Sequence, residues 1–516
     1  MVISERVQKA VCFAIESGYQ LDKGAFDFLE TMSQKGDPVQ LMEEAMKKVG
    51  ALPEKPLFIE RSVLEEVTKR IFPEREEVKT PLPQPILQAR KVAFRAYAKD
   101  VNTHVEVIED PTDEICTTGS MEEYLEYFQD RFKRIERLLK KRRDTRDATT
   151  ISEALKAPVN SKIKIIGMII EKRERKQRVF LRVDDLEASA TVLLPPKVME
   201  KAQKVLLDQV VCISVIKGRN DLLIAEDFLL PDVPQKTPQK ASIPVYAALI
   251  SDLHVGSKMF MHEALQQFVL WLNGRLGNKN FRETAGHVKY VVIAGDLVDG
   301  IGIYPEQMKE LAIKDIYKQY QAMAKFAEEI PDYIEVIIIP GNHDASRKAL
   351  PQPAISRDYA EPLYEARKLF SLGNPATVNL HGVELLLYHG RSLDDVVGAA
   401  SNVSFHSPDK AMKLLLQSRH LAPTYGQKTP IAPERRDFLV IERVPDIFHT
   451  GHVHVLKYDT YRGTLMLNSG AMQSQTEYQR KMGLEPTPGI VPIVNLQTLK
   501  VTPIPFPISS AQAPSQ

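Results

Sequence analysis

The 516-residue sequence contains only three cysteines, Cys12, Cys116 and Cys212, and they stand far apart. This spacing fits neither a disulfide framework nor a thiolate metal site, so we expect a protein of the reducing cytoplasm. No run of about 18 apolar residues occurs, which argues against a membrane span. The first residues also lack the apolar core of a signal peptide.

Neither sign of charge dominates the sequence. It has 68 Lys and Arg against 67 Asp and Glu, a formal net charge of +1. Overall charge therefore does not predict nucleic-acid binding. A hydrophobic content of 43% and a charged content of 26% are typical of a globular chain with an ample core. The length predicts about two to four domains.

Five short polar segments follow β-like apolar runs between residues 245 and 454. They are Asp252-Leu-His254, Gly295-Asp296, Gly341-Asn-His-Asp344, His389-Gly390 and Gly451-His-Val-His454. The run before the fifth segment is shorter than the other four but is also apolar and β-like. Polar residues gathered where buried strands end are typical of an active site in an α/β sheet.

The residue types in these segments suit divalent metal ions. Carboxylate oxygen, imidazole nitrogen and amide oxygen without thiolate favour Mn, Fe(II) or Zn. In Asp252-Leu-His254 both side chains point the same way at a strand end, and Asp296 can bridge two ions. Two ions about 3.5–4 Å apart activate water and clamp both oxygens of an in-line displacement at phosphorus. The residues therefore favour a two-metal phosphoesterase.

The motif order D-x-H, G-D-x-x-D, G-N-H-D, H-G and G-H-x-H resembles the calcineurin-type metallophosphoesterase superfamily. The resemblance implies a first ion on Asp252, His254 and His454 and a second on Asn342, His389 and His452, with Asp296 shared by both. It also implies that His343 is a catalytic histidine and not a ligand, which protonates the leaving oxygen or offsets charge on the phosphate.

Three further residues near the motifs have less defined roles. Asp344 could orient the imidazole of His343. Asp299 completes the second motif, but we assign it no direct role. Arg391 fits either a phosphate contact or a loop salt bridge, and we favour the phosphate contact slightly.

The residues before the motifs divide into several stretches. Residues 1–72 have helical apolar spacing and predict a small helical domain. Residues 73–120 are rich in Pro and charge and predict a linker. Residues 121–150 predict an amphipathic helix with a strongly basic outer face, which is either solvated or in contact with phosphate or a partner.

Residues 155–232 contain five strand candidates, with a helical stretch after the third, and this is the order of an OB-fold barrel. The basic segment 171–178 is predicted as a loop of the kind with which OB folds meet nucleic acid, but Phe180 is the only strand aromatic, so a scaffold role is equally open. A linker at 233–244 leads into a phosphoesterase domain at 245–505. Residues 506–516 predict a disordered tail without a convincing sliding-clamp motif.

This domain order resembles the B-type accessory subunits of replicative DNA polymerases, and more closely the small subunits of archaeal DNA polymerase D. Three stretches carry the similarity, residues 127–139, 336–344 and 479–489, and the last has no physical interpretation from the sequence. The resemblance implies an α/β fold, with a four-layer calcineurin-like sandwich behind the barrel and the helical domain.

The same resemblance implies a function. It is that of a proofreading 3′→5′ exonuclease that acts on DNA beside a large catalytic polymerase subunit. A sliding clamp is a further candidate partner, which would dock on the C-terminal tail. The cofactor it implies is a pair of divalent ions, most often Mn²⁺, with Fe and Zn left open. A stand-alone metallophosphatase or phosphodiesterase and a catalytically silent assembly subunit remain as alternatives.

Overall fold

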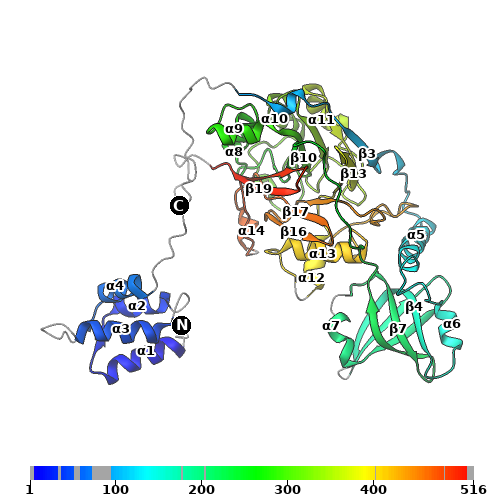
Figure 1. The fold of residues 1–516 in the computed structure, drawn as a ribbon, viewed down its shortest axis with the longest axis horizontal. Helices are drawn as coiled ribbons and strands as arrows, with labels where there is room; N and C mark the ends of the chain where they lie inside the picture. Colours follow the sequence, from blue (N-terminus) through cyan, green and yellow to red (C-terminus); the bar gives the residue numbers. More distant parts are fainter. Residues whose placement is uncertain are drawn as a thin grey trace. The chain divides into compact units, whose positions relative to one another are not determined.

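The computed structural model describes residues 5–32, 37–50, 58–71, 94–175, 178–202, 205–400, 403–481 and 483–507. The chain divides into two compact units, residues 1–86 and 87–516 (Figure 1). Among the described helices, none is long and apolar enough to cross a membrane.

The first unit is built from four amphipathic helices. They are α1 (Glu5–Glu16), α2 (Lys23–Met32), α3 (Pro38–Gly50) and α4 (Arg61–Ile71), with two short parallel strands, β1 (Gln20–Leu21) and β2 (Phe58–Ile59). Val7, Ala10 and Leu41 of the predicted apolar stripes are buried in one core. A helical unit therefore lies where the spacing predicted one.

The second unit contains a closed five-stranded barrel, as predicted. Its strand order is β4 (Lys162–Arg175), β5 (Arg178–Asp184), β6 (Ser189–Leu194), β8 (Leu222–Leu229) and β7 (Val210–Lys217). A 3₁₀ turn at Pro196–Val198 and the short helix α7 (Met199–Ala202) lie between β6 and β7.

The basic segment 171–178 is not the predicted loop. Strand β4 continues through Glu171 to Arg175, and Arg173 and Glu174 pair with Phe180 and Val179 of β5. The cross-strand hydrogen bonds satisfy the backbone whatever the charge of the side chains, so composition alone misplaced the strand end.

Two six-stranded sheets make up the rest of the second unit. The first has the order β12 (Phe370–Ser371), β11 (Glu335–Ile339), β10 (Val288–Ala294), β9 (Tyr246–Ile250), β18 (Ile490–Asn495) and β19 (Lys500–Pro505). The second has the order β16 (Lys457–Tyr461), β17 (Thr464–Asn468), β15 (Ile447–Thr450), β14 (Val383–Leu387), β13 (Ala376–Leu380) and β3 (Val105–Glu109).

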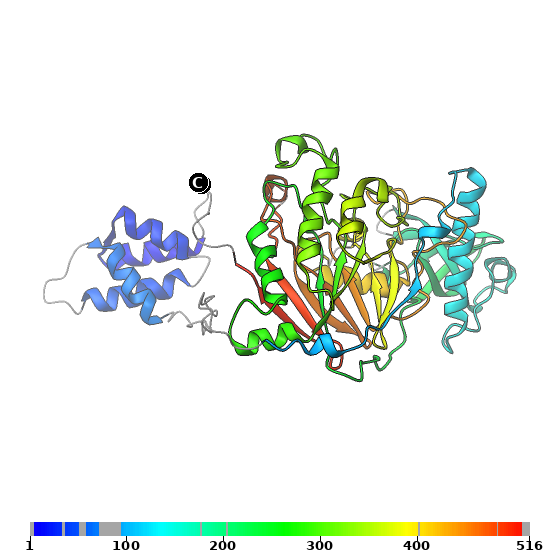
Figure 2. The same ribbon diagram turned by 90° about the horizontal axis from the view of Figure 1, so that it is seen from above.

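The two sheets share one apolar core. Leu249, Val292 and Ile337 of the first sheet belong to the same buried cluster as Val378 and Leu385 of the second. The helices that pack against the first sheet are α8 (His262–Leu272), α9 (Lys279–Gly286), α10 (Ile316–Glu329) and α11 (Arg357–Ala366). Those that pack against the second sheet are α12 (Leu393–Ala399) and α13 (Pro408–Ser418) (Figure 2). The predicted mixed α/β class is confirmed.

The predicted linker at 73–120 is wrong over part of its length. Strand β3 lies within it and forms the edge of the second sheet, where Val107 pairs with Val378 of β13. The alternation of Val105, Glu106 and Val107 is that of a strand, but the many Pro, Glu and Asp residues around it hid the pattern. Residues 73–93 lie outside the described residues.

The predicted basic helix is shorter than 121–150, and part of its basic face is buried. Helix α5 (Met121–Lys140) ends at Lys140, and α6 (Ile151–Lys156) follows after a turn. Arg131 is 0% exposed, and its Nε lies 2.8 Å from Oδ2 of Asp437. Arg134 is also buried and donates to the carbonyl oxygen of Asp437. These two arginines face the protein because their acidic and carbonyl partners are supplied by a segment about three hundred residues away, which helical spacing cannot show.

The predicted tail begins too early. Phe506 is 1% exposed, and its ring lies 5.8 Å from that of Trp271 and 5.6 Å from that of Phe268. A buried aromatic side chain of this size contributes to the core, so the fold extends to this residue. Residues 508–516 lie outside the described residues.

Candidate metal centre

The ends of five strands meet at the predicted site. Asp252 follows β9, Asp296 follows β10, Asn342 and His343 follow β11, His389 follows β14, and His452 and His454 follow β15. Strands β9, β10 and β11 are parallel in one sheet, and β14 and β15 are parallel in the other. Parallel strands present their carboxyl ends at the same edge, so motifs separated by 200 residues in sequence come together.

Three residues predicted for the first ion converge. Nε2 of His454 lies 3.3 Å from Oδ1 of Asp252 and 3.1 Å from Nε2 of His254. Nε2 of His254 lies 3.8 Å from Oδ2 of Asp296, the residue predicted to be shared. Asp252, His254 and His454 are all buried, and their nitrogen and oxygen atoms have the spacing of a metal-ligand group.

Two of the residues predicted for the second ion also converge with Asp296. Nε2 of His389 lies 3.0 Å from Oδ1 of Asn342 and 3.3 Å from Oδ2 of Asp296. The ring of His452 lies 5.3 Å from that of His389, but its Nε2 is 3.3 Å from Oδ2 of Asp394. The structure therefore places all seven predicted ligands in one cluster, with His452 directed toward Asp394 at its rim.

The hydrogen bonds of His389 indicate that a cation fits this cluster. Its Nδ1 donates to the carbonyl oxygen of Ala294 at 2.8 Å, so in the neutral ring Nε2 carries a lone pair. In that neutral form the lone pair would face the acceptor oxygens of Asn342 and Asp296. Three acceptors at such distances repel one another unless a positive charge lies among them, and either a proton on Nε2 or a divalent ion supplies that charge.

The pKa values of the same groups lead to the same conclusion. Burial lowers the pKa of His389, but the carboxylates of Asp296 and Asp252 outweigh burial and raise it to about 9. Burial is likewise outweighed at His254, where Asp299 and Asp296 raise the pKa to about 9. Protons and metal ions would therefore compete for these nitrogens, because both neutralise the same buried carboxylates.

The backbone at the site is held in an uncommon conformation. Five of the seven predicted ligands have left-handed φ values: Asp252 at 53°, His254 at 50°, Asp296 at 52°, His452 at 70° and His454 at 61°. Residues other than glycine rarely adopt this region, and such residues cluster at functional sites, where the surrounding fold holds them. Gly295 has a φ of 90°, and a Cβ there would lie 2.6 Å from Nδ1 of His389.

Two residues without a predicted role hold the ligand rings. Oδ1 of Asp299 lies 3.0 Å from Nδ1 of His254, and the side-chain amide of Gln479 lies 2.9 Å from Nδ1 of His454. The carboxylate of Asp299 accepts from Nδ1 of His254 and so leaves the opposite nitrogen of that ring for a metal, whereas the amide nitrogen of Gln479 donates to Nδ1 of His454 and fixes the orientation of the ring. Asp299 could have been found from its place in G-D-x-x-D. Gln479, at the start of the uninterpreted stretch 479–489, gave no such signal.

Replacing Asp299 with alanine is therefore expected to weaken Mn²⁺ binding by about 10- to 100-fold, because His254 loses the carboxylate that orients it. Isothermal titration calorimetry measures this effect directly. The matched control is Asp332→Ala, which removes a carboxylate from a loop away from the cluster. Equal affinities in the two variants would contradict the role assigned to Asp299.

The expectation that Asp344 orients His343 is wrong. Asp344 is buried and accepts hydrogen bonds from the backbone N–H groups of Gly341 at 2.9 Å and Leu297 at 3.2 Å, and from the hydroxyl of Tyr320 at 3.1 Å. These hydrogen bonds connect the loop that carries Asn342 to the loop that carries Asp296. The side chain points into the protein because three donors lie there, which adjacency in sequence cannot reveal.

His343 is oriented by the backbone instead. Its Nδ1 donates to the carbonyl oxygen of Asp299 at 2.7 Å, and its own N–H donates to Oδ1 of Asp296 at 2.7 Å. The imidazole lies edge-on to that of His254, with ring centroids 4.6 Å apart. Nε2 is thus left for a substrate at the border of the cluster.

Arg391 lies beside the part of the site that contains Asn342. Its Nη1 is 3.4 Å from the carbonyl oxygen of Lys348, whose own Nζ donates to the carbonyl oxygen of Asn342 at 2.7 Å. Two cationic side chains therefore stand beside the proposed second ion. The phosphate contact predicted for Arg391 stays a prediction.

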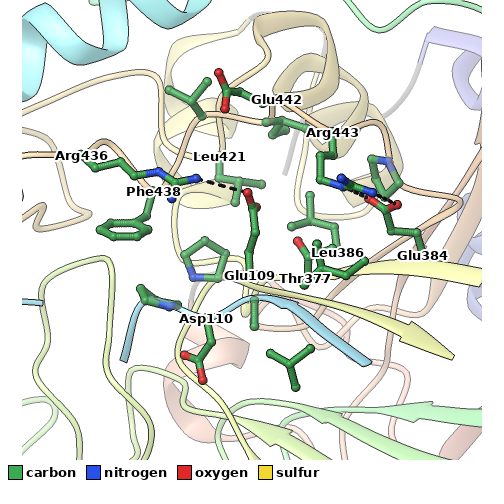
Figure 3. Close-up of a pocket in the computed structure, with 18 of the residues that line it drawn as sticks. Glu109, Asp110, Thr377, Glu384, Leu386, Leu421, Arg436, Phe438, Glu442 and Arg443 are labelled. Atoms are coloured by element: carbon green, nitrogen blue, oxygen red, sulfur yellow. Dashed lines mark hydrogen bonds and ion pairs between the residues drawn. The ribbon is translucent and has the colours of Figure 1, made fainter. Parts of the chain in front are cut away.

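A different cavity, of about 330 Å³, lies between β3, β14 and the loop at 434–445 (Figure 3). Its arginines are already paired. Arg436 lies 3.2 Å from Glu109, and Arg443 makes two contacts of 2.9 Å with Glu384. Because carboxylates neutralise these guanidinium groups, the cavity has little attraction for a phosphate.

Comparison with known proteins places this chain among replication proteins. A DNA polymerase II small subunit from Archaeoglobus fulgidus is 39% identical over 482 residues, which cover 92% of this chain and 93% of the relative. The chain belongs to the family of archaeal DNA polymerase II small subunits, the small subunits of polymerase D.

Other members of the small-subunit family agree with this assignment. The protein from Methanothermobacter thermautotrophicus is 41% identical over 401 residues, covering 77% of this chain and 82% of the relative. That from Methanocaldococcus jannaschii is 39% identical over 406 residues, with 77% and 68% covered. The family model for the B-type subunit of DNA polymerase alpha/epsilon matches residues 247–458, a range that contains every predicted ligand and His343.

Proposed function

We propose that this chain is the proofreading 3′→5′ exonuclease of a heteromeric replicative DNA polymerase. Its partners would be DNA and a large catalytic polymerase subunit, and its place of action the cytoplasm. Membership of the small-subunit family supports the polymerase role. The observation that supports the nuclease role most directly is the convergence of buried nitrogen and oxygen atoms in two groups that share Asp252, with Asp296 and His389 in one and His254 and His454 in the other.

The α/β arrangement around the site supports a calcineurin-like phosphoesterase domain of four layers, helices outside two sheets. Asp252, His254 and His454 would hold one divalent ion, and Asn342, His389 and His452 the other, with Asp296 between them. Mn²⁺ suits this set of oxygen and nitrogen ligands, and so do Fe and Zn. When bound, the ions supply Lewis acidity that activates water and offsets negative charge on the phosphate.

The protein's own groups then direct the reaction at the 3′ end of a strand. Water attacks the terminal phosphorus, the bond from phosphorus to the 3′ oxygen of the preceding nucleotide breaks, and a 5′-mononucleotide leaves. In its protonated form, His343 would give that 3′ oxygen a proton from Nε2, because the carbonyl oxygen of Asp299 holds the hydrogen on Nδ1 at the opposite side of the ring. Arg391 and Lys348 would hold the phosphate from the side of Asn342.

The test is a Mn²⁺-dependent assay of the full chain on single strands labelled at either end. We expect the 5′ label to pass through progressively shorter strands and the 3′ label to appear at once as a mononucleotide. Chelation of divalent ions should abolish both signals, because the ligands cannot activate water alone.

The same assay separates the alternatives. Hydrolysis of p-nitrophenyl phosphate without loss of either DNA label would establish a phosphatase. Metal-dependent shortening of the 3′-labelled strand from its 5′ end would reverse the proposed polarity. Loss of neither substrate at any Mn²⁺ concentration would leave the assembly subunit as the function.

A further inference from the structure

A second cavity, of about 500 Å³, opens directly beside His343. The loops after β10 and β11, together with the start of helix α10 and helix α11, form its walls; they include Ile301, Ile303, Ile316, His343, Lys348 and Tyr359. The lining combines apolar and polar residues, with the ring of Tyr359 and two cationic side chains, Arg347 and Lys348, near the residues proposed to act on phosphate. Its volume lies within the range of cavities that hold small ligands, about 300–1,000 Å³.

Large apolar side chains around this cavity are unusually exposed. Ile301 and Tyr359 are each 40% exposed, and Tyr317 is 53% exposed. The rings of Tyr317 and Tyr359 are stacked, with centroids 5.7 Å apart and planes inclined by 27°. Such a group beside a concave site marks a surface that another molecule covers. Because Tyr317 backs one face of Tyr359, the Tyr359 ring is held in place by packing.

Lys348 connects the cavity to the metal cluster. Its Nζ donates to the carbonyl oxygens of Asn342 at 2.7 Å and Asp344 at 3.4 Å, and the residue also lines the cavity. An ammonium group at this border attracts an anion that spans cluster and cavity. A nucleotide has the required form, since it joins an anionic phosphate to a flat aromatic base.

We propose that this cavity is a base pocket, which receives the unstacked base of the nucleotide at the scissile phosphodiester. Tyr359 is the stacking face, Ile301 and Ile303 are the apolar walls, and Lys348 stands near the phosphate. A base that enters such a pocket has left its duplex, so Tyr359 is a specificity-determining residue for frayed strand ends. This inference rests on the proposed exonuclease function.

The experiment compares two 5′-labelled single strands that differ only at the last nucleotide, which either carries its base or is abasic. In the full chain with Mn²⁺, the natural end should be removed about tenfold faster, because its base can stack on the aromatic ring and an abasic end cannot. Tyr359→Ala should bring the two rates to within about twofold, while Tyr359→Phe should retain the preference, since the ring and not the hydroxyl stacks.

The control variant is Tyr458→Ala, which removes a tyrosine that is 45% exposed on β16 and does not line the cavity. Its preference for the natural end should equal that of the unmodified protein. A Tyr359→Ala chain that still prefers the natural end to the same degree overturns the base pocket.

Binding measurements separate this inference from the proposed function. Fluorescence anisotropy of the same two strands with the full chain reports the pocket without cleavage. If no DNA is cleaved but tighter binding of the natural end depends on Tyr359, the nuclease proposal fails and the pocket stands. Equal binding of both strands, together with equal cleavage, overturns the pocket while leaving the nuclease proposal intact.

Discussion

Replacing Asp296 with alanine is expected to lower the rate of DNA cleavage by about a thousandfold or more. Its Oδ2 lies 3.3 Å from Nε2 of His389 and 3.8 Å from Nε2 of His254, so it is common to both ligand groups. The metal contribution at stake is several kcal/mol, and each step of about 1.36 kcal/mol is a factor of ten in rate. Initial rates on a labelled strand and calorimetric titration with Mn²⁺ measure cleavage and metal binding together.

His343→Ala is the matched variant for Asp296→Ala. It should slow cleavage by about 10²- to 10⁴-fold, the usual contribution of general acid–base catalysis, yet keep its Mn²⁺ affinity, because His343 is no predicted ligand. The two variants therefore separate metal binding from proton transfer. Full Mn²⁺ stoichiometry in Asp296→Ala would refute the shared ligand, and unchanged cleavage in both variants would favour the assembly subunit.

Replacing Arg131 with methionine is expected to destabilise the second unit by about 3–5 kcal/mol, because the buried carboxylate of Asp437 then loses its guanidinium partner and keeps His420 as a side-chain partner. Arg131 Nε lies 2.8 Å from Oδ2 of Asp437, and both side chains are at most 1% exposed. Arg131 also donates to the hydroxyl of Tyr127 at 2.7 Å. Urea unfolding of the full chain, followed in the transition of the second unit, gives the change in its free energy of unfolding.

A double variant and a surface control make this prediction specific. Arg131→Met combined with Asp437→Leu should lose less stability than Arg131→Met alone, since no uncompensated charge remains. Arg435→Met breaks a contact of 3.8 Å with Glu126 between exposed side chains, and should cost only about 0–1 kcal/mol. If Arg131→Met lost as little stability as Arg435→Met, the prediction that the buried pair stabilises the second unit would be wrong.

The sequence predicted those parts of the fold and site that have short-range signatures. The strands before Asp252, Asp296 and Asn342 are continuous apolar runs, which is typical of parallel strands buried on both faces. The barrel strands have clear β patterns separated by turn residues, and the ligand motifs follow strand ends. These features depend on neighbours within about ten residues, and the motif resemblance supplied the ligand order.

What the sequence did not reveal depends on contacts between distant segments. Gln479 meets His454 from a different loop, and Asp437 meets Arg131 across 306 residues. Strand β3 was obscured because its pairing partner lies far along the chain and its surroundings resemble a linker. Local composition described charge and proline content correctly in each case, but it could not say which of those charges would be buried.

Helix α5 packs between the barrel and the part of the second unit that contains the two six-stranded sheets. Phe132, Ile135 and Leu139 pack on Ile166 and Val210 of the barrel strands, and the same cluster includes Val440 near the second sheet. On its other side the helix is bonded through Arg131 to Asp437. A partner bound to the barrel would therefore also be coupled to the two sheets, because helix α5 packs on the one and is bonded to a loop beside the other.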